Sequence, residues 1–90
     1  MNSVINIRIL TAKGCEVCNF VKAWINELGK ANDIDIVLEE IDSENERAIN
    51  LAIKYNIFDI PSFIIGETVF CGDKYAAPDV LSAINKVLLR

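Results

Sequence analysis

The chain has 90 residues, of which 52% are hydrophobic and 24% charged, and its formal net charge is −4. This balance is typical of a folded single domain, and the acidic excess argues against a nucleic-acid-binding protein, which would carry a basic face. No apolar run approaches the roughly 20 residues that a membrane-spanning helix needs, and the N-terminus lacks the basic start and cleavage site of a signal peptide. We therefore expect one cytoplasmic domain over residues 1–90, with no membrane or nucleic-acid partner.

The chain contains three cysteines and no histidine. An odd number of cysteines at this spacing does not suit the disulfide framework of a small secreted protein. Without histidine, Ser–His and Cys–His catalytic pairs and histidine-based metal sites are excluded. In the reducing cytosol, closely spaced cysteines are usually catalytic or metal-binding, so these are the two functions to consider for the cysteines of this chain.

The first predicted elements are a strand over residues 4–10 and a helix that opens at Cys15. The strand is rich in β-branched residues, and alternate positions share one face: Ile5, Ile7 and Ile9. A turn over residues 11–14 follows. The next apolar residues recur with the period of a helix and form one stripe: Val17, Phe20, Val21, Trp24, Ile25 and Leu28. We expect Trp24 to lie in the core, and Gly29 with the polar stretch after it to end this helix.

The middle of the chain predicts a second strand over residues 34–41 and a second helix after it. Alternating apolar residues mark the strand: Ile34, Ile36 and Leu38. Ser43, with Glu46 three positions later, matches the capping box that begins many helices, and the helical pattern continues to about Tyr55. The residues expected to face the core are Ala48, Ile49, Ala52 and Ile53.

The last third of the chain predicts a hairpin and a final helix. Residues 56–61 form a loop that ends in Pro61. Two short apolar runs, over residues 62–65 and 68–71, are separated by a tight Gly-containing turn and are predicted to pair as antiparallel strands. Pro78 suits the first turn of a helix that completes the chain.

The element order is therefore β-α-β-α-β-β-α, which predicts an α/β fold. The first two strands and the helix between them form a βαβ unit, so these strands should be parallel with a right-handed crossover. The hairpin should extend the same sheet in antiparallel fashion, giving a four-stranded mixed sheet with helices on both faces.

The strongest chemical signal is the pair Cys15 and Cys18, which opens the first helix directly after the first strand. This is the placement of a redox-active Cys-x-x-Cys pair. Free N–H groups and the helix dipole favour a thiolate on Cys15, and Lys13 adds a nearby positive charge. Cys18 lies one turn further on the same side and should be more buried. We interpret Cys15 as the nucleophile and Cys18 as the resolving thiol.

A metal or iron–sulfur carrier that uses the same thiolates is the alternative function. A closed structural metal site normally needs four ligands, usually cysteine and histidine. The chain offers Cys15, Cys18 and Cys71, so such a site would need a carboxylate or a second chain. Cys71 itself is interpreted as a small apolar residue at a strand end, with a third redox or ligating thiol as the other possibility.

At this point the sequence resembles the thioredoxin/glutaredoxin superfamily. The resemblance rests on element order over nearly the whole chain and on three segments: Lys13–Cys18, Ile60–Phe63 and Gly72–Asp73. It departs from typical thioredoxins, which have Trp before the first cysteine and Gly-Pro between the two, and from typical glutaredoxins, which have Pro-Tyr there. The resemblance implies a small glutaredoxin-like redoxin that is active as a monomer.

The resemblance also implies substrate-binding positions. In the family, the proline that matches Pro61 is cis and faces the cysteine pair, which leaves the backbone of Ile60 free to pair with an extended substrate. Lys13 and Asp73 match positions that contact glutathione. Gly72 is the second residue of the pair that in glutaredoxins reads Gly-Gly beside the glutathione pocket.

Phe58 and Asp59 precede this proline segment, and two interpretations stay open for them. They line the substrate groove, or they form an ordinary exposed loop.

The implied activity is that of a dithiol–disulfide oxidoreductase in electron transport. Its substrates would be protein disulfides or glutathione mixed disulfides. We expect no bound cofactor. Glutathione as co-substrate and a flavoenzyme resembling thioredoxin reductase are the alternative electron donors.

Overall fold

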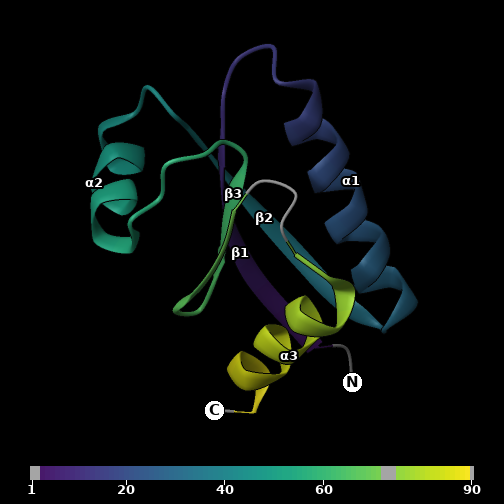
Figure 1. The fold of residues 1–90 in the computed structure, drawn as a ribbon. Helices are drawn as coiled ribbons and strands as arrows, with labels where there is room; N and C mark the ends of the chain where they lie inside the picture. The colour runs from purple at the N-terminus through teal and green to yellow at the C-terminus, as the bar shows by residue number, and fades with distance from the viewer. Residues whose placement is uncertain (1–2, 72–74, 90) are drawn as a thin grey trace.

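The computed structural model describes residues 3–71 and 75–89. Seven elements follow one another along the chain: β1 (Ser3–Thr11), α1 (Glu16–Ala31), β2 (Ile34–Asp42), α2 (Glu46–Tyr55), β3 (Ser62–Ile65), β4 (Thr68–Cys71) and α3 (Ala77–Leu88). The strands form one sheet in the order β2-β1-β3-β4, in which β1 and β2 are parallel and the other pairs antiparallel. Figure 1 shows α1 and α3 on one side of this sheet and α2 on the other, so the predicted α/β fold is confirmed.

The face covered by α1 and α3 holds the larger core. Alternate residues of β1 point into it and are buried: Ile5, Ile7 and Ile9. From the opposite side α1 contributes Val21 and Ile25, and α3 contributes Val80 and Ile84. Phe63 of β3 lies at 1% exposure, stacked on Phe70 at 5.1 Å between ring centroids. Trp24 packs at the edge of this cluster, as expected of a core residue.

The first helix ends within the polar stretch predicted to end it, but Gly29 itself does not end the helix. The helix continues to Ala31, and Gly29 is buried at the point where α1 crosses β2. A Cβ atom at this position would lie 2.8 Å from the carbonyl oxygen of Ile34 and 2.8 Å from Cδ1 of Ile36. Glycine is therefore present because the helix and the strand approach closely there.

The second face of the sheet is covered by α2 alone. Leu10 and Ile41 from the sheet meet Ala48 and Leu51 from the helix in a smaller core, which Ile57 and Ile64 complete. The predicted capping box is wrong, because the helix is capped by Asn45, whose side chain accepts a hydrogen bond from the Arg47 N–H. Ser43 and Asn45 are both good capping residues, and the chain uses the later one.

The expectation that Ile49 and Ile53 face the core is also wrong. Ile49 is 51% exposed and Ile53 is 73% exposed, while Leu51 takes the buried position of the helix. Neither of the two isoleucines belongs to the core cluster on this face. The helix thus has a broad apolar surface of which one part is buried and another part faces solvent.

Among the described residues, no helix is both long and apolar enough to cross a membrane.

Candidate active site

The candidate site begins in the turn that joins β1 to α1. After Thr11 the chain makes a tight turn that is closed by a hydrogen bond from the Cys15 N–H to the Ala12 carbonyl at 3.2 Å. Gly14 has a φ of +72°, a conformation that a residue with a side chain rarely adopts. This turn delivers Cys15 to the N-cap of α1, and the predicted start of the helix is correct to within one residue.

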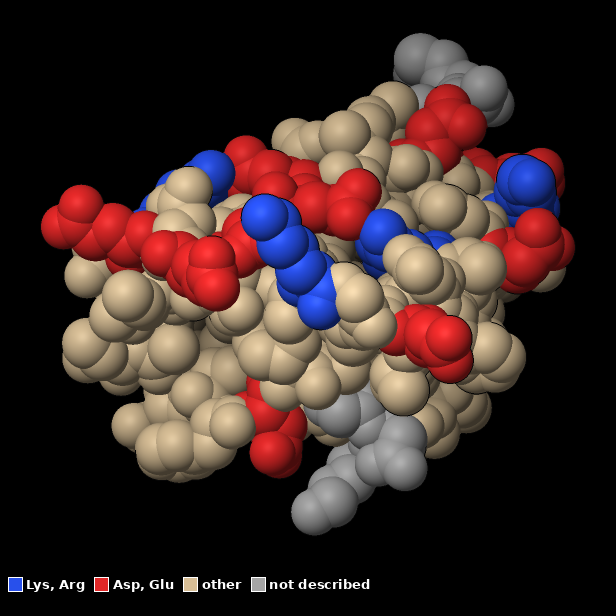
Figure 2. Space-filling view, turned by 90° about the horizontal axis from the view of Figure 1, so that it is seen from above, with Lys and Arg blue, Asp and Glu red and all other residues tan. Residues whose placement is uncertain are grey.

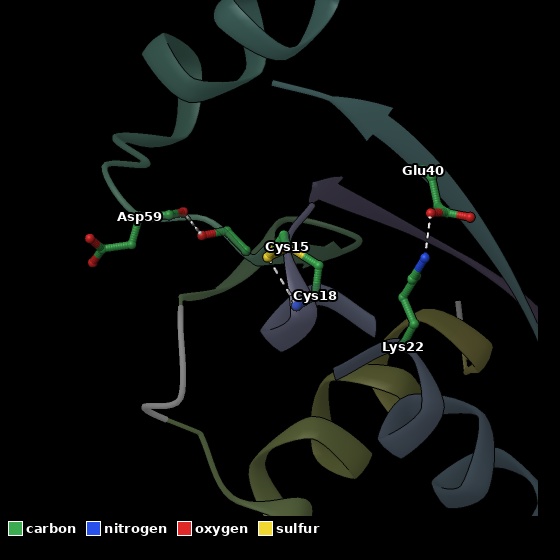
Figure 3. The surroundings of a disulfide bond; sticks show 6 residues. Cys15, Cys18, Lys22, Glu40 and Asp59 are labelled. Carbon is green, nitrogen blue, oxygen red and sulfur yellow. Dashed lines mark hydrogen bonds and ion pairs between the residues drawn. A yellow bond between two sulfur atoms is a disulfide. The ribbon is translucent and has the colours of Figure 1, made fainter. Parts of the chain in front are cut away.

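Cys15 and Cys18 form a disulfide with a Cα–Cα distance of 5.3 Å (Figure 3). Cys15 is partly exposed, whereas Cys18 is only 2% exposed and packs under the first turn. The backbone N–H of Cys18 donates a hydrogen bond to Sγ of Cys15 at 3.1 Å. The outer sulfur therefore accepts one of the free donors at the helix start, in the way an N-cap oxygen does.

Charged side chains lie on both sides of Cys15 in the sequence. Lys13 and Glu16 flank Cys15 and are both exposed, so their opposite effects on the thiolate are screened by solvent. Lys22, one turn past Cys18, is held away by an ion pair with Glu40 of β2 at 2.7 Å (Figure 3). Among the described residues, the N-terminus of α1 is the fixed feature that favours a negative charge on Cys15.

The loop before β3 lies at the same end of the sheet as the disulfide. Leu10, near the end of β1, pairs with Ser62, the first residue of β3, and β1 leads from there to Cys15. Figure 1 shows this loop and the start of α1 at one end of the molecule, and Figure 3 shows Asp59 beside the cysteine pair. The topology therefore brings together two segments that are far apart in sequence.

Within this loop, the bond between Ile60 and Pro61 is cis, as the resemblance implied. Pro61 is buried, and Ile60 is 38% exposed. The Ser62 hydroxyl donates a hydrogen bond to the Asp59 carbonyl and ties the loop to the strand. No backbone hydrogen bond joins Ile60 to the rest of the described chain, so its N–H and C=O are available to a partner.

Solved structures of other proteins are similar to this chain in fold. No protein-family model and no curated protein matches the sequence. Among solved structures, the thioredoxin-like protein BC3987 superposes with a TM-score of 0.59 at 25% identity, over 86% of this chain and 97% of that one. Thioredoxin 1 from Thermosipho africanus gives 0.59 at 24% identity, over 94% and 96% of the two chains. A thioredoxin-like protein from Clostridium perfringens gives 0.66 at 18% identity, over 96% and 72%.

The protein has a thioredoxin-like fold. Together with the disulfide between Cys15 and Cys18, this supports membership of the thioredoxin superfamily. The Cys-x-x-Cys pair of this chain lies at the start of its first helix, α1.

Sequence reasoning missed one feature of this thioredoxin-like site. A groove of about 480 Å³ lies between α2 and the loop before β3. The exposed Ile49 and Ile53 line one side of it, and Phe58 and Ile60 line the other. Phe58 is 89% exposed, and Phe58 and Asp59 both line this groove, while its use by a substrate stays a prediction. The sequence signal for this groove is the apolar surface of the second helix, which is wider than the part of the helix that contacts the core.

The remaining predicted site residues are placed as follows. Lys13 is exposed in the turn before Cys15. Gly72 and Asp73 lie outside the described residues. Cys71 is in no disulfide and is partly exposed at the end of β4, opposite Ser62 of β3. Within residues 3–71 and 75–89, no group of three or more Cys, Asp or Glu side chains is arranged to hold a metal ion.

Proposed function

We propose that this thioredoxin-like protein is a dithiol–disulfide oxidoreductase in which Cys15 is the nucleophile and Cys18 the resolving thiol. The observation that carries the proposal is the Cys15–Cys18 disulfide at the N-terminus of α1, in which Cys15 is partly exposed and Cys18 is buried. A thiol at a helix N-terminus has a lowered pKa in general, and the thiolate is the attacking species. In the disulfide form the Cys18 N–H donates a hydrogen bond to Sγ of Cys15, and in the reduced protein the same donor would favour a thiolate there.

In the reduced protein, the Cys15 thiolate attacks one sulfur of a substrate disulfide. A bond forms between Cys15 and that sulfur, the substrate S–S bond breaks, and the second substrate sulfur leaves as a thiolate. The Cys18 thiolate then attacks Sγ of Cys15, which forms the intramolecular disulfide and releases the first substrate sulfur. Two electrons pass from the protein dithiol to the substrate, and the two thiol protons end on the two substrate thiols.

The substrates proposed are protein disulfides or glutathione mixed disulfides. To return to the dithiol, the protein needs a two-electron donor, which is either glutathione or a flavoenzyme resembling thioredoxin reductase. We place the protein in the cytoplasm, where thiols are kept reduced, and propose that it acts as a monomer.

Trapping of the mixed disulfide tests the assignment of roles. In a Cys18→Ser variant, Cys15 should attack a substrate disulfide, but no resolving thiol is present to release the substrate. A mixed disulfide between protein and substrate should therefore accumulate, and dithiothreitol should cleave it. In a Cys15→Ser variant no complex should form, and disulfide reduction should fall by at least about a thousandfold, the order expected when a covalent nucleophile is lost. Cys71→Ala is the matched control and should retain activity.

Two outcomes would contradict the proposal. If Cys15→Ser traps substrate and Cys18→Ser does not, the two roles are reversed. If neither variant loses activity relative to Cys71→Ala, the cysteine pair is not the redox centre.

Purified protein that is coloured and contains stoichiometric iron or other metal would favour the carrier function instead. Supplying the oxidised protein with glutathione or with thioredoxin reductase then identifies the donor.

A further inference from the structure

Ser62 is a polar residue at a position where the fold otherwise places apolar side chains. Its exposure is 0%, and within residues 3–71 and 75–89 it is the only polar or charged residue that is buried. It begins β3, whose other three residues are apolar and each 1% exposed: Phe63, Ile64 and Ile65. Valine in its place would remove more apolar surface from water, so the hydrophobic effect does not explain this serine.

The hydroxyl of Ser62 holds the backbone of the loop that precedes β3. It donates a hydrogen bond to the carbonyl of Asp59. The loop residues Phe58, Asp59 and Ile60 are exposed, and no backbone–backbone hydrogen bond joins these three to another described residue. In this exposed stretch, the hydrogen bond from Ser62 is therefore the polar contact that fixes the backbone.

This hydrogen bond also orients the N–H of Ile60. The Asp59 carbonyl and the Ile60 N–H belong to one peptide unit, which is trans, since the one cis bond of the described chain follows Ile60. In a planar trans peptide the C=O and the N–H point in opposite directions. Ser62 holds the carbonyl toward the start of β3, so the N–H is turned the other way. That N–H has no partner among the described residues and is left for another molecule.

The oriented N–H lies at the end of the molecule that carries the redox pair. Figure 3 shows Asp59 and its hydrogen bond beside the disulfide of Cys15 and Cys18. Figure 2, which looks onto this end of the molecule, shows a broad uncharged surface on the α2 side, bordered by acidic side chains. On an uncharged surface, backbone groups such as the Ile60 N–H can supply the polar contacts to an extended substrate chain.

We infer that Ser62 is a positioning residue for the proposed disulfide reduction. By holding the carbonyl of Asp59, its hydroxyl fixes the plane of the next peptide unit and presents the N–H of Ile60 to a main-chain carbonyl of the substrate. The inference rests on the proposed function and concerns polypeptide substrates, because a disulfide without peptide bonds has no such carbonyl.

Single-turnover kinetics with two substrates test this role. A short cysteine peptide and 2-mercaptoethanol are each prepared as a mixed disulfide with the same chromogenic thiol, and pre-reduced protein should release that thiol from both. Ser62→Ala should lower the ratio of the peptide rate constant to the mercaptoethanol rate constant about two- to tenfold, the range expected when one neutral hydrogen bond is lost. Ser62→Thr keeps a hydroxyl and should restore the ratio. Ser62→Ala should fold, because Asp59 is exposed and water can replace the lost donor.

Two controls separate positioning from general effects. Ser82→Ala removes a hydroxyl from an exposed position of α3 and should keep the wild-type ratio. Iodoacetamide should alkylate Cys15 at the same rate in reduced wild type and reduced Ser62→Ala, because the N-terminus of α1 is unchanged.

Four results would overturn the role of Ser62 alone. They are an unchanged ratio in Ser62→Ala, an equal loss on both substrates, slower alkylation of Cys15, or a Ser62→Thr variant with a wild-type urea midpoint and the ratio of the alanine variant. A wild-type protein that releases the thiol from neither substrate overturns the proposed function as well.

Discussion

The two faces of the sheet differ in how they use their apolar residues. On the face covered by α1 and α3, eleven buried residues form one cluster, and both helices bring apolar side chains to it. On the other face, the ten-residue α2 completes a core of six and leaves two of its isoleucines in solvent. The contrast indicates that burial, and with it stability, is concentrated on the first face. Substitutions on the two faces should therefore differ in their effect on the free energy of unfolding.

The largest effect is expected for Phe63→Ala on the well-packed face. Phe63 is almost fully buried and contacts the Phe70 and Tyr75 rings, so its truncation removes burial and leaves a cavity. We expect a loss of about 3–5 kcal/mol in the free energy of unfolding, measured by urea denaturation. Phe58→Ala is the matched control on the other face and should change stability by less than about 0.5 kcal/mol. Similar losses for both phenylalanines would contradict the contrast between the faces.

The next effect compares two neighbours on α2. Leu51→Ala removes a buried side chain from the smaller core and should cost about 2–3 kcal/mol, at the low end for leucine because the site lies near the surface. Ile53→Ala removes an exposed side chain and replaces it with a better helix former, so the unfolding free energy should stay within about 0.5 kcal/mol of wild type. A costly Ile53→Ala would show that the groove is part of the core.

Gly29→Ala tests the close approach between α1 and β2. At an open position in a helix this change would stabilise the protein by about 1 kcal/mol, since glycine is a poor helix former. Here the added methyl group overlaps the Ile34 carbonyl and the Ile36 side chain, so we expect a net loss of about 1–3 kcal/mol. The sign of the change is the decisive result, and a stabilised variant would show that the strand can move away at little cost.

The sequence predicted what depends on local pattern. The hairpin strands over residues 62–65 and 68–71 match the structure residue for residue, because a short apolar run bounded by a tight turn has few alternatives. Cys15 was placed at the helix start because the period changes there from alternating to helical. These signals come from neighbouring residues and need no knowledge of the tertiary structure.

What the sequence did not predict depends on contacts between distant segments. The role of Gly29 requires knowing that β2 passes under the end of α1. The apolar pattern of α2 is the same whether a given side chain meets the sheet or a ligand, so periodicity could not distinguish Leu51 from Ile53. The groove exists only because the loop before β3 comes to lie beside that helix.

The smallest expected effect concerns the exposed pair of Glu39 on β2 and Arg47 on α2, whose closest nitrogen–oxygen distance is 2.8 Å. The hydrogen bond from Arg47, with a smaller contribution from its charge, holds the pKa of Glu39 below its usual value of 4.5. A carboxyl whose pKa is lower in the folded state stabilises the protein above the unfolded pKa, and this contribution disappears as the pH falls through the folded value. Arg47→Met should therefore lower the urea midpoint slightly at neutral pH, and the two proteins should converge in acid below the folded pKa of Glu39. High salt should also reduce the difference, because the pair is exposed to solvent.

Lys86→Met removes the same charge from α3, where the described residues provide no carboxylate partner, and should show no such convergence. A midpoint difference between wild type and Arg47→Met that persists in acid would mean that Arg47 holds α2 to the sheet by packing rather than by charge.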